Sequence, residues 1–219
     1  MRIPPARFSP LVAVLLGAVL VVAFFIQFGL ISVAFDKLGL TEKSALLLAV
    51  TSFLGSAINL PIYELSGDPA LPPATADHQG GFTEYHGTTL LMVNVGGCLV
   101  PVAFSIYLFR QVPFDLLPVL TIMAVVAAVS YRFSQTVPGA GIAIPTLIPP
   151  AVAALLAALI DPKHAASSAY IAGTLGVLLG ADLLKLNSLR LMRVPAMSLG
   201  GAGTFDGVFL AGLLAALLA

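Results

Sequence analysis

The sequence predicts an all-α fold, a polytopic membrane helix bundle of about seven transmembrane segments, some of them broken by proline or glycine. Of the 219 residues, 59% are hydrophobic and only 9% are charged, whereas about 25% of the residues in soluble domains are charged. Several apolar runs reach the roughly 20 residues that a helix needs to cross a bilayer. We therefore expect a single integral membrane domain over residues 1–219.

Hydropathy places the segments in order along the chain. The first follows a basic start and is longer than the apolar core of a signal peptide, about 7–15 residues, so we expect a retained membrane helix. The fifth either spans the membrane or re-enters it, and the seventh is short for a complete span. The expected segments are residues 10–35, 44–63, 88–109, 115–133, 141–160, 166–189 and 203–219.

Three of these segments are interrupted by helix-breaking residues. Asn59 stands just before Pro61, Asn94 precedes a Gly-Gly pair, and Pro145 lies in a proline-rich stretch. Proline removes a backbone donor and clashes with the preceding turn, so the freed carbonyl groups must be buried in protein or line a cavity. Together the interruptions favour a polar cavity, while each one alone also fits a kinked helix packed on its neighbours.

The charged residues bear on partners and on orientation. The net charge is zero, so no basic surface indicates a nucleic-acid partner, and the expected partner is the lipid bilayer. With the N-terminus in the cytoplasm of a prokaryotic cell, more Lys and Arg residues lie inside than outside the inner membrane, as the positive-inside rule requires. The inner group is Arg2, Arg7, Arg132, Lys185, Arg190 and Arg193, and the outer group is Lys37, Lys43, Arg110 and Lys163.

An irregular polar loop is expected at about residues 64–87, which are rich in Pro and Gly. It carries His78, His86 and several acids, a set of side chains that suits a metal ion, but a solvated loop without metal is the simpler interpretation. We therefore expect no metal and no cofactor. The single cysteine, Cys98, lies in an apolar stretch and is interpreted as a small buried hydrophobe.

Two aspartates lie inside the last apolar segments, Asp182 in the sixth and Asp206 in the seventh. A carboxylate in lipid costs roughly 2.5–3.5 kcal/mol on insertion scales, so such acids usually face a cavity, a partner or a reacting group. At 1.5 Å per residue both acids are expected on the order of 10 Å below the same membrane face. A short linker joins their helices, which are therefore expected to be antiparallel neighbours, and the two carboxylates can meet.

Two carboxylates that meet would support acid–base chemistry. They cannot both ionise easily, so the pair shares a proton. The ionised member can then take a proton from water while the protonated member polarises a carbonyl, which hydrolyses an amide without a metal. Glycines at GxxxG spacing, Gly176 with Gly180 and Gly203 with Gly207, permit close helix approach. Plain helix packing is the alternative role of these glycines.

An acid in one helix, then Gly-x-Gly and an acid at the start of the next, resembles the GxGD intramembrane aspartyl proteases, which include presenilin, signal peptide peptidase and the prepilin peptidases. The resemblance implies that Asp182 and Asp206 form the catalytic dyad, with Gly201 and Gly203 in the glycine positions. Two residues stand here between the second glycine and the acid, where the family has none. The whole chain also resembles a prokaryotic family of multi-pass membrane proteins of unknown function, through its NVGG and GAGTFDG motifs.

The expected function is an aspartyl endopeptidase that hydrolyses membrane-embedded peptides or membrane proteins. The residues expected to bind substrate beside the dyad are Asn94, Gly180, Gly201, Gly203 and Pro145.

Two other interpretations remain open. The first is a transporter or channel with an ion or substrate site at the broken helices, formed by Asn59, Asn94, Pro145 and Asp182. The second is structural: Asp182 would pair with Lys185 three residues later, and Asp206 would cap the last helix.

Overall fold

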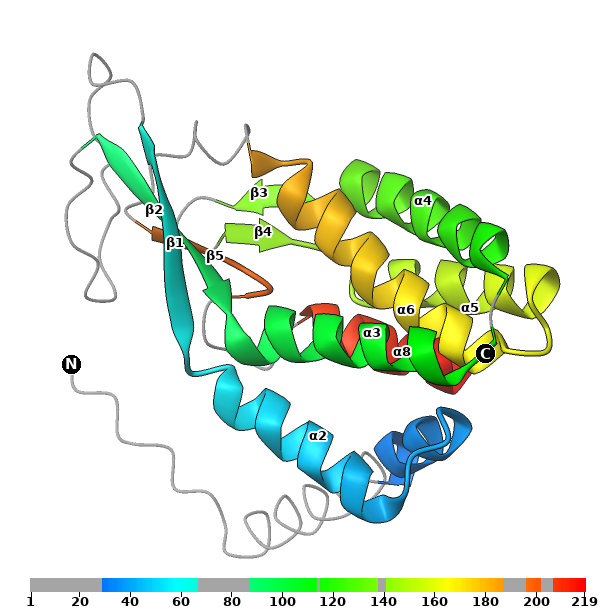
Figure 1. Cartoon of the computed structure of the whole chain (residues 1–219). Helices are drawn as coiled ribbons and strands as arrows, with labels where there is room; N and C mark the ends of the chain where they lie inside the picture. Colours follow the sequence, from blue (N-terminus) through cyan, green and yellow to red (C-terminus); the bar gives the residue numbers. More distant parts are fainter. Residues whose placement is uncertain (1–28, 67–86, 114, 138–140, 187–195, 202–206) are drawn as a thin grey trace, which may run out of the picture.

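The computed structural model describes residues 29–66, 87–113, 115–137, 141–186, 196–201 and 207–219, which form a helical bundle with a small sheet at one end (Figure 1). From α3 onward, successive helices run alternately away from the sheet and back to it (Figure 1). The helices are the segment Gly29–Lys37, α2 (Glu42–Gly55), η1 (Val95–Leu99), α3 (Val100–Gln111), α4 (Leu116–Phe133), α5 (Ile148–Ile160), α6 (Ala165–Val177), η2 (Leu178–Leu183) and α8 (Gly207–Leu218), of which η1 and η2 are π-helical.

Two described helices are long and apolar enough to cross a membrane. They are α4, with 18 residues, and the continuous stretch Ala165–Leu183 that joins α6 and η2, with 19. A third span results if Gly29–Lys37 and α2, which meet at a bend of 113°, count as one broken span. The apolar helices support a membrane protein, but the described residues hold two or three candidate spans, so the expected number of about seven is not confirmed.

The all-α expectation is wrong at the end of the second expected segment and at the start of the third. There the chain forms β1 (Asn59–Ser66) and β2 (Thr88–Asn94), an antiparallel pair. Pro61 has no N–H to continue a helix, but it is tolerated in an edge strand such as β1. The register of the β1–β2 pairing shifts between Pro61 and Tyr63. Threonines and valine in β2 also favour extended backbone.

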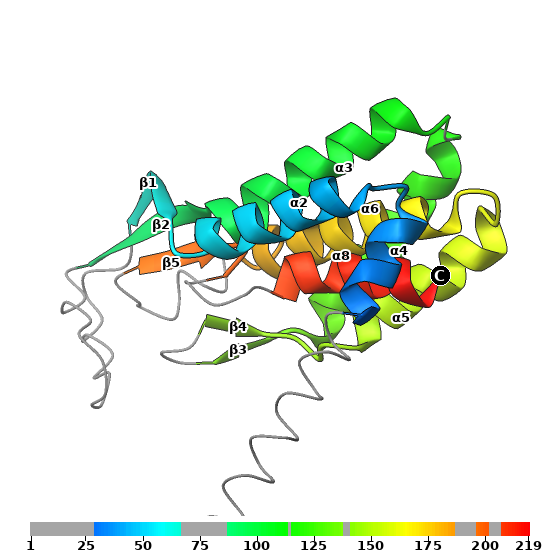
Figure 2. The ribbon, with the colours of Figure 1, turned by 90° about the horizontal axis from the view of Figure 1, so that it is seen from below.

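A third strand completes the sheet at the same end of the bundle. β5 (Ala196–Leu199) runs parallel to β2, so the strand order is β1-β2-β5. A separate hairpin, β3 (Gln135–Val137) with β4 (Gly141–Ala143), follows α4 and lies at the same end of the bundle as the sheet (Figure 2). The prolines near Pro145 therefore mark the connection from a strand to α5 and not a break inside a helix.

The centre of the bundle is α6, whose buried residues point in all directions. Tyr170 is fully buried and makes an edge-to-face contact with Phe104 of α3 at 5.0 Å between ring centroids. Toward α8, Gly173 and Gly212 let the helix backbones approach, because a Cβ on Gly173 would lie only 3.0 Å from that of Ala215. Large side chains are thus excluded where α6 and α8 cross.

On the other side of the continuous helix, Gly176 of α6 and Gly180 of η2, one of the two predicted GxxxG pairs, pack against α4. A Cβ on Gly176 would lie 2.7 Å from Val126, and one on Gly180 would lie 2.1 Å from the carbonyl oxygen of Ala127. The close approach expected from this spacing is confirmed, and the neighbour is α4.

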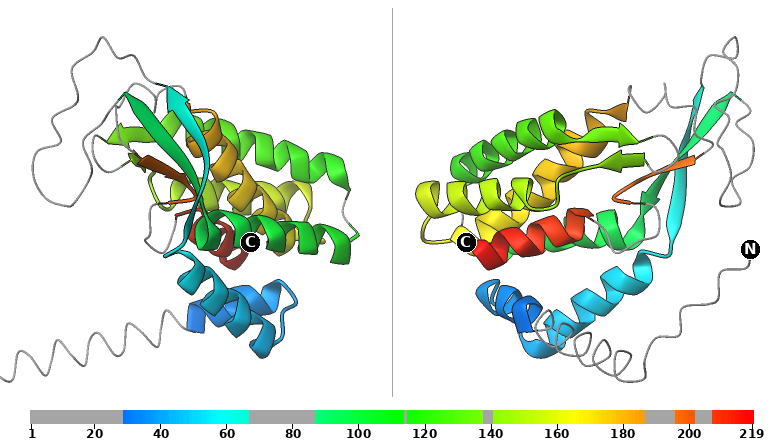
Figure 3. Two further views of the ribbon diagram at one scale, coloured as in Figure 1. Left: turned by 60° about the vertical axis from the view of Figure 1, so that its left-hand side comes forward. Right: turned by 180° about the vertical axis from the view of Figure 1, so that it is seen from behind.

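The segment Gly29–Lys37 is held at the end of the bundle farthest from the sheet (Figure 3). Phe35 and Leu38 are buried in a cluster with Leu108 of α3 and Phe209 of α8. Lys37 Nζ also donates to the carbonyl oxygen of Leu217 at 2.8 Å, and a cation suits the C-terminal end of a helix.

Gly180→Ala should lower the free energy of unfolding by about 1–3 kcal/mol, because the new Cβ overlaps a backbone atom that no rotamer change can move. Thermal unfolding in detergent measures the loss. Gly29→Ala is the matched control, since a Cβ there meets nothing within 4 Å. Equal midpoints for the two variants would contradict the close contact between α4 and η2.

Candidate functional site

The sheet end of the bundle brings together residues from five segments of the chain. Both π-helical turns are here: η1 follows β2 directly, and η2 is the last turn of the helix that begins with α6. A π-helical turn widens the backbone locally and is often found at functional sites. Asn94 lies just before η1, and Asp182 lies within η2.

Asn94 is fully buried and uses both ends of its side-chain amide. Its Oδ1 accepts a hydrogen bond from the N–H of Gly97 at 2.7 Å, which caps the start of η1. Its Nδ2 donates to the carbonyl oxygen of Ser56 at 2.7 Å and to Oδ1 of Asn59 at 3.0 Å. One side chain therefore ties η1 to the end of α2 and to β1.

Asn59 accepts a second hydrogen bond on the same oxygen, from Ser198 Oγ of β5 at 2.6 Å. The sequence singled out both Asn59 and Asn94, and the structure brings them together. Ser198 was missed, because its role appears only once β5 is placed in the sheet.

A close glycine contact joins η1 to α2. A Cβ on Gly96 would lie 1.8 Å from the carbonyl oxygen of Ser52, and the Ser52 hydroxyl donates to the carbonyl oxygen of Gly96 at 2.7 Å. Gly96 thus allows the two backbones to touch, and η1 continues into α3 without a break.

Asp182 is partly buried, and its Oδ2 accepts a hydrogen bond from the N–H of Gly200 at 2.8 Å. Gly200 has φ +79°, and a Cβ there would lie 2.7 Å from both the amide nitrogen and Cβ of Cys98. Gly201 follows with φ +96°. Only glycine fits such a turn at Gly200, and the turn aims the end of β5 at the carboxylate.

The ion-pair interpretation requires Lys185 to turn toward Asp182, and the structure shows that it does not. Its Nζ donates to the carbonyl oxygen of Ser134 at the end of α4 and lies 5.3 Å from the centroid of the Tyr131 ring. Burial lowers the pKa of the Lys185 amine, and the charge of Arg132 lowers it further. Lys185 therefore caps α4 and leaves Asp182 with a backbone partner.

The structure places the other predicted site residues as follows. Gly180 packs on α4, and Gly201 lies one residue beyond the partner of Asp182. Pro145 is exposed, and its carbonyl oxygen accepts a hydrogen bond from the N–H of Ile148 at 3.3 Å, which opens the turn into α5. Asp206 and Gly203 lie outside the described residues, so the predicted meeting of the two carboxylates stays a prediction.

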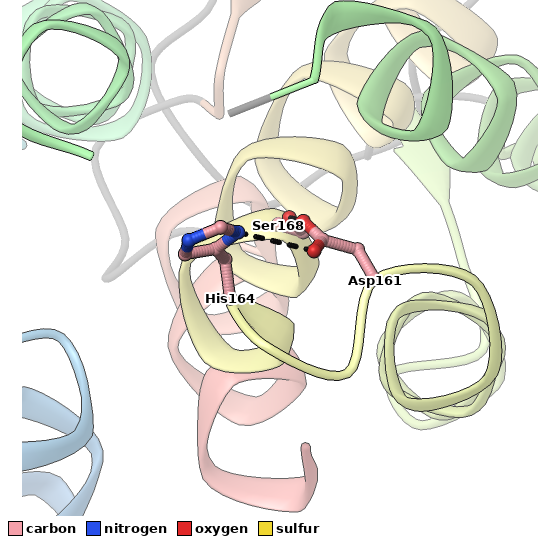
Figure 4. A network of polar contacts seen from close by, with 3 residues as sticks. All are labelled: Asp161, His164 and Ser168. Carbon is pink, nitrogen blue, oxygen red and sulfur yellow. Dashed lines mark hydrogen bonds and ion pairs between the residues drawn. The ribbon is translucent and has the colours of Figure 1, made fainter. Parts of the chain in front are cut away.

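A polar cluster that the sequence did not predict lies in the turn between α5 and α6 (Figure 4). Asp161 bridges His164 Nδ1 at 3.1 Å and the hydroxyl of buried Ser168 at 2.5 Å. In a catalytic triad the histidine would stand between acid and serine. Here the acid stands between the other two, an arrangement that fastens the turn to the first turns of α6. An acid followed by His at i+3 and Ser at i+7 was the available signal.

No group of three or more His, Cys, Asp or Glu side chains in the described parts of the chain is arranged to hold a metal ion. His78 and His86 of the polar loop lie outside those parts.

A family model matches residues 53–218, which is most of the chain. The chain belongs to the DUF1614 family. This family is described as protein of unknown function, so membership brings no activity with it. The matched range of the DUF1614 protein includes Asn59, Asn94, Asp182 and Asp206. No curated protein and no solved structure matches the chain, and nothing in these comparisons supports the resemblance to the GxGD proteases.

Asn94→Ala should destabilise the protein, because the Gly97 N–H and the Ser56 carbonyl lose their partner inside the protein. An unsatisfied buried group costs about 1–3 kcal/mol. The free energy of unfolding in detergent is the quantity to measure. Thr121→Ala is the control: this exposed hydroxyl bonds only a carbonyl of its own helix, so its loss should leave stability nearly unchanged. A similar small effect at Asn94 would refute its role as a tie between segments.

Proposed function

We propose that this protein is an intramembrane aspartyl endopeptidase in which Asp182 and Asp206 act as an acid–base pair on membrane-embedded peptide. The observation that carries the proposal is the hydrogen bond from Gly200 to Asp182, at 2.8 Å. It ties the first acid to the segment of chain that leads to the second. The backbone hydrogen bond itself holds that segment next to Asp182.

Chain connectivity supports a short distance between the acids. Asp206 follows Gly200 closely in sequence, and the stretch between them reaches at most about 20 Å when fully extended. Gly207, the next residue, begins α8, which packs along α6 through Gly173 and Gly212. The helix that follows the second acid, α8, is therefore fixed against the helix that carries the first.

The sheet offers a place for an extended peptide. Among the described strands, β5 pairs with β2 on one side only, and it leads directly into Gly200. An extended peptide can add to such an edge through main-chain hydrogen bonds. A peptide added to β5 would run toward Asp182, which places a scissile amide within reach of the proposed pair.

The chemistry follows from one shared proton. The ionised carboxylate accepts a proton from water as the water oxygen bonds to the carbonyl carbon, while the protonated carboxyl donates its proton to the carbonyl oxygen. When the C–N bond breaks, the nitrogen takes the proton from the carboxyl group that deprotonated the water. A hydroxyl proton of the intermediate returns to the carboxylate that had protonated the carbonyl oxygen, so the pair regains its starting state.

The structure gives less support to a transporter or channel than to a hydrolase. Asn59 and Asn94 do meet, but their amide groups are engaged with each other, with Ser198 and with the backbone. Pro145, which this interpretation takes to mark a broken helix, is exposed in the turn before α5. An ion would have to break this network before it could bind.

Asp182→Asn and Asp206→Asn should each lower the rate of peptide cleavage about 10³-fold or more, because the two acids act as one unit. The assay uses purified protein in liposomes with a single-span reporter peptide, and mass spectrometry identifies the products. Asp115→Asn is the matched control, since this acid precedes α4 at the opposite end of the bundle and makes no side-chain cap bond. Cleavage that survives in either dyad variant would refute the proposal.

We further propose that the sheet end faces the cytoplasm of a prokaryotic cell, with the N-terminus inside. The two groups of basic residues support this orientation. Arg132 lies in the last turn of α4 and Lys185 lies just after η2, both at the sheet end of the bundle. Arg110 and Lys163 lie at the other end, where α3 stops and α5 turns into α6 (Figure 1). The division matches the one that the positive-inside rule requires.

Cysteine labelling tests this orientation in a Cys98→Ala background, which removes the only native thiol. Glu64→Cys in β1 and Lys163→Cys in the α5–α6 turn are both exposed. A membrane-impermeant maleimide applied to intact cells stripped of any outer membrane should label position 163 at once. It should label position 64 only after the membrane is permeabilised. The reverse pattern would overturn the proposed orientation.

A further inference from the structure

A chain of hydrogen bonds connects β1 to Asp182 by way of β5. Asn59 Oδ1 in β1 accepts a hydrogen bond from Ser198 Oγ in β5 at 2.6 Å. Ser198 precedes Gly200 by two residues, and the N–H of Gly200 donates to Asp182 Oδ2 at 2.8 Å. The mechanism described above uses the last of these contacts and leaves Asn59 and Ser198 without a role.

The surface against which Gly200 packs depends on the same amide group. Asn94 Nδ2 donates to Asn59 Oδ1 at 3.0 Å, and Asn94 Oδ1 accepts from the N–H of Gly97 at 2.7 Å. A Cβ on Gly200 would lie 2.7 Å from the carbonyl carbon of Gly97, so Gly200 rests directly on this turn of η1. Asn59 therefore holds β5 through Ser198 and, through Asn94, the support beneath Gly200.

Both contacts restrain the direction in which the N–H of Gly200 points. Gly200 has φ +79° and no room for a side chain, so its direction is set by the strand before it and by the surface under it. A parallel β2–β5 pairing fixes the strand along its length, with Met92 opposite Ser198. The hydroxyl of Ser198 adds a side-chain restraint close to the turn.

From these contacts we infer that Asn59 and Ser198 are positioning residues that hold the Gly200 N–H on Asp182 and so orient this carboxylate for reaction. The inference rests on the proposed function. Neither residue touches water or peptide in the reaction; both act through Gly200. Partners that orient the ligands of a metal typically change activity about 10- to 100-fold when they are removed, and we expect an effect of this size for partners that orient a reacting carboxylate.

The competing explanation is that the network only stabilises the sheet. In that case Ser198→Ala would lower the melting temperature and leave the properties of Asp182 as they are. A positioning role makes a different demand, because the orientation of one carboxylate should change while the fold persists.

The first test is the steady-state kinetics of Ser198→Ala, with Ser198→Thr as the matched variant that keeps the hydroxyl. Both are purified in lipid nanodiscs and measured on the single-span reporter peptide. We expect kcat of Ser198→Ala to fall about 10- to 100-fold with KM nearly unchanged, and Ser198→Thr to recover most of the loss. A fall that Ser198→Thr does not recover, or a change confined to KM, would overturn the inference.

The second test does not need catalysis and guards against a variant that fails to fold. In protein labelled with ¹⁵N-glycine, the Gly200 amide resonance is the one that Asp182→Asn moves because its hydrogen-bond acceptor changes. Asn59→Ala and Ser198→Ala approach the contact from its two sides, and each should move the same resonance in the same direction. Thr121→Ala should not move it.

These outcomes separate the inference from the function on which it rests. If Asp182→Asn abolishes cleavage while Asn59→Ala and Ser198→Ala leave both kcat and the Gly200 resonance unchanged, the dyad stands and the positioning role is refuted. If Asp182→Asn cleaves normally, the proposed function is refuted. A shifted Gly200 resonance in the two network variants would then still support their control of the Asp182 contact.

Discussion

An amide side chain buried among apolar helices must find a partner for each donor and acceptor, since an unsatisfied group is costly where water is absent. Asn94 meets this demand by reaching the end of α2, the start of η1 and Asn59 in β1. Those bonds can be made together only if α2, β1 and η1 keep one arrangement. The position of the sheet on the bundle, and with it the position of β5 beside Asp182, depends on this constraint.

The arrangement also requires backbones to approach closely, and glycine residues make this possible. The backbone of Gly96 lies against that of Ser52, and Gly200 lies on the turn of η1. In lipid the hydrophobic effect does not drive helices together, so close packing and hydrogen bonds must supply the association. The polar network and the small residues therefore work together: the glycines bring the backbones close, and Asn94 fixes their register.

The sequence predicted the long helices well and the sheet not at all. Residues 115–133 were expected as a span, and α4 occupies Leu116–Phe133, because a uniform apolar run with few breakers has one stable form in lipid. β1 and β2 hold apolar residues and adjoin the apolar runs of α2 and of η1–α3, so hydropathy did not separate them from the helices. Pro61 and the β-branched residues of β2 were the local signals, but their pairing depends on residues far apart in the chain.

The candidate site was predictable in its residues and unpredictable in its contacts. Asn59, Asn94 and Asp182 were each singled out as polar groups in apolar surroundings, for sound energetic reasons. That Asn59 would meet Asn94 required the hairpin, and that Asp182 would bind a backbone N–H required β5. The two π-helical turns were not predicted, although the Gly-Gly pair of η1 had indicated an interruption at that point.

The lengths of the helices explain why polar groups gather at the sheet end. α5 has 13 residues and α8 has 12, so at 1.5 Å per residue each is about 20 Å long, short of a hydrocarbon core of about 30 Å. The sheet, the β3–β4 hairpin and the turns extend the bundle beyond these helices at that end. Within the hydrocarbon core, backbone outside helices is tolerated only where it is buried in protein or lines a water-filled space. Asp182 lies where the helices stop and the sheet begins, and the proposed hydrolysis requires that water and an extended peptide backbone reach this part of the bundle.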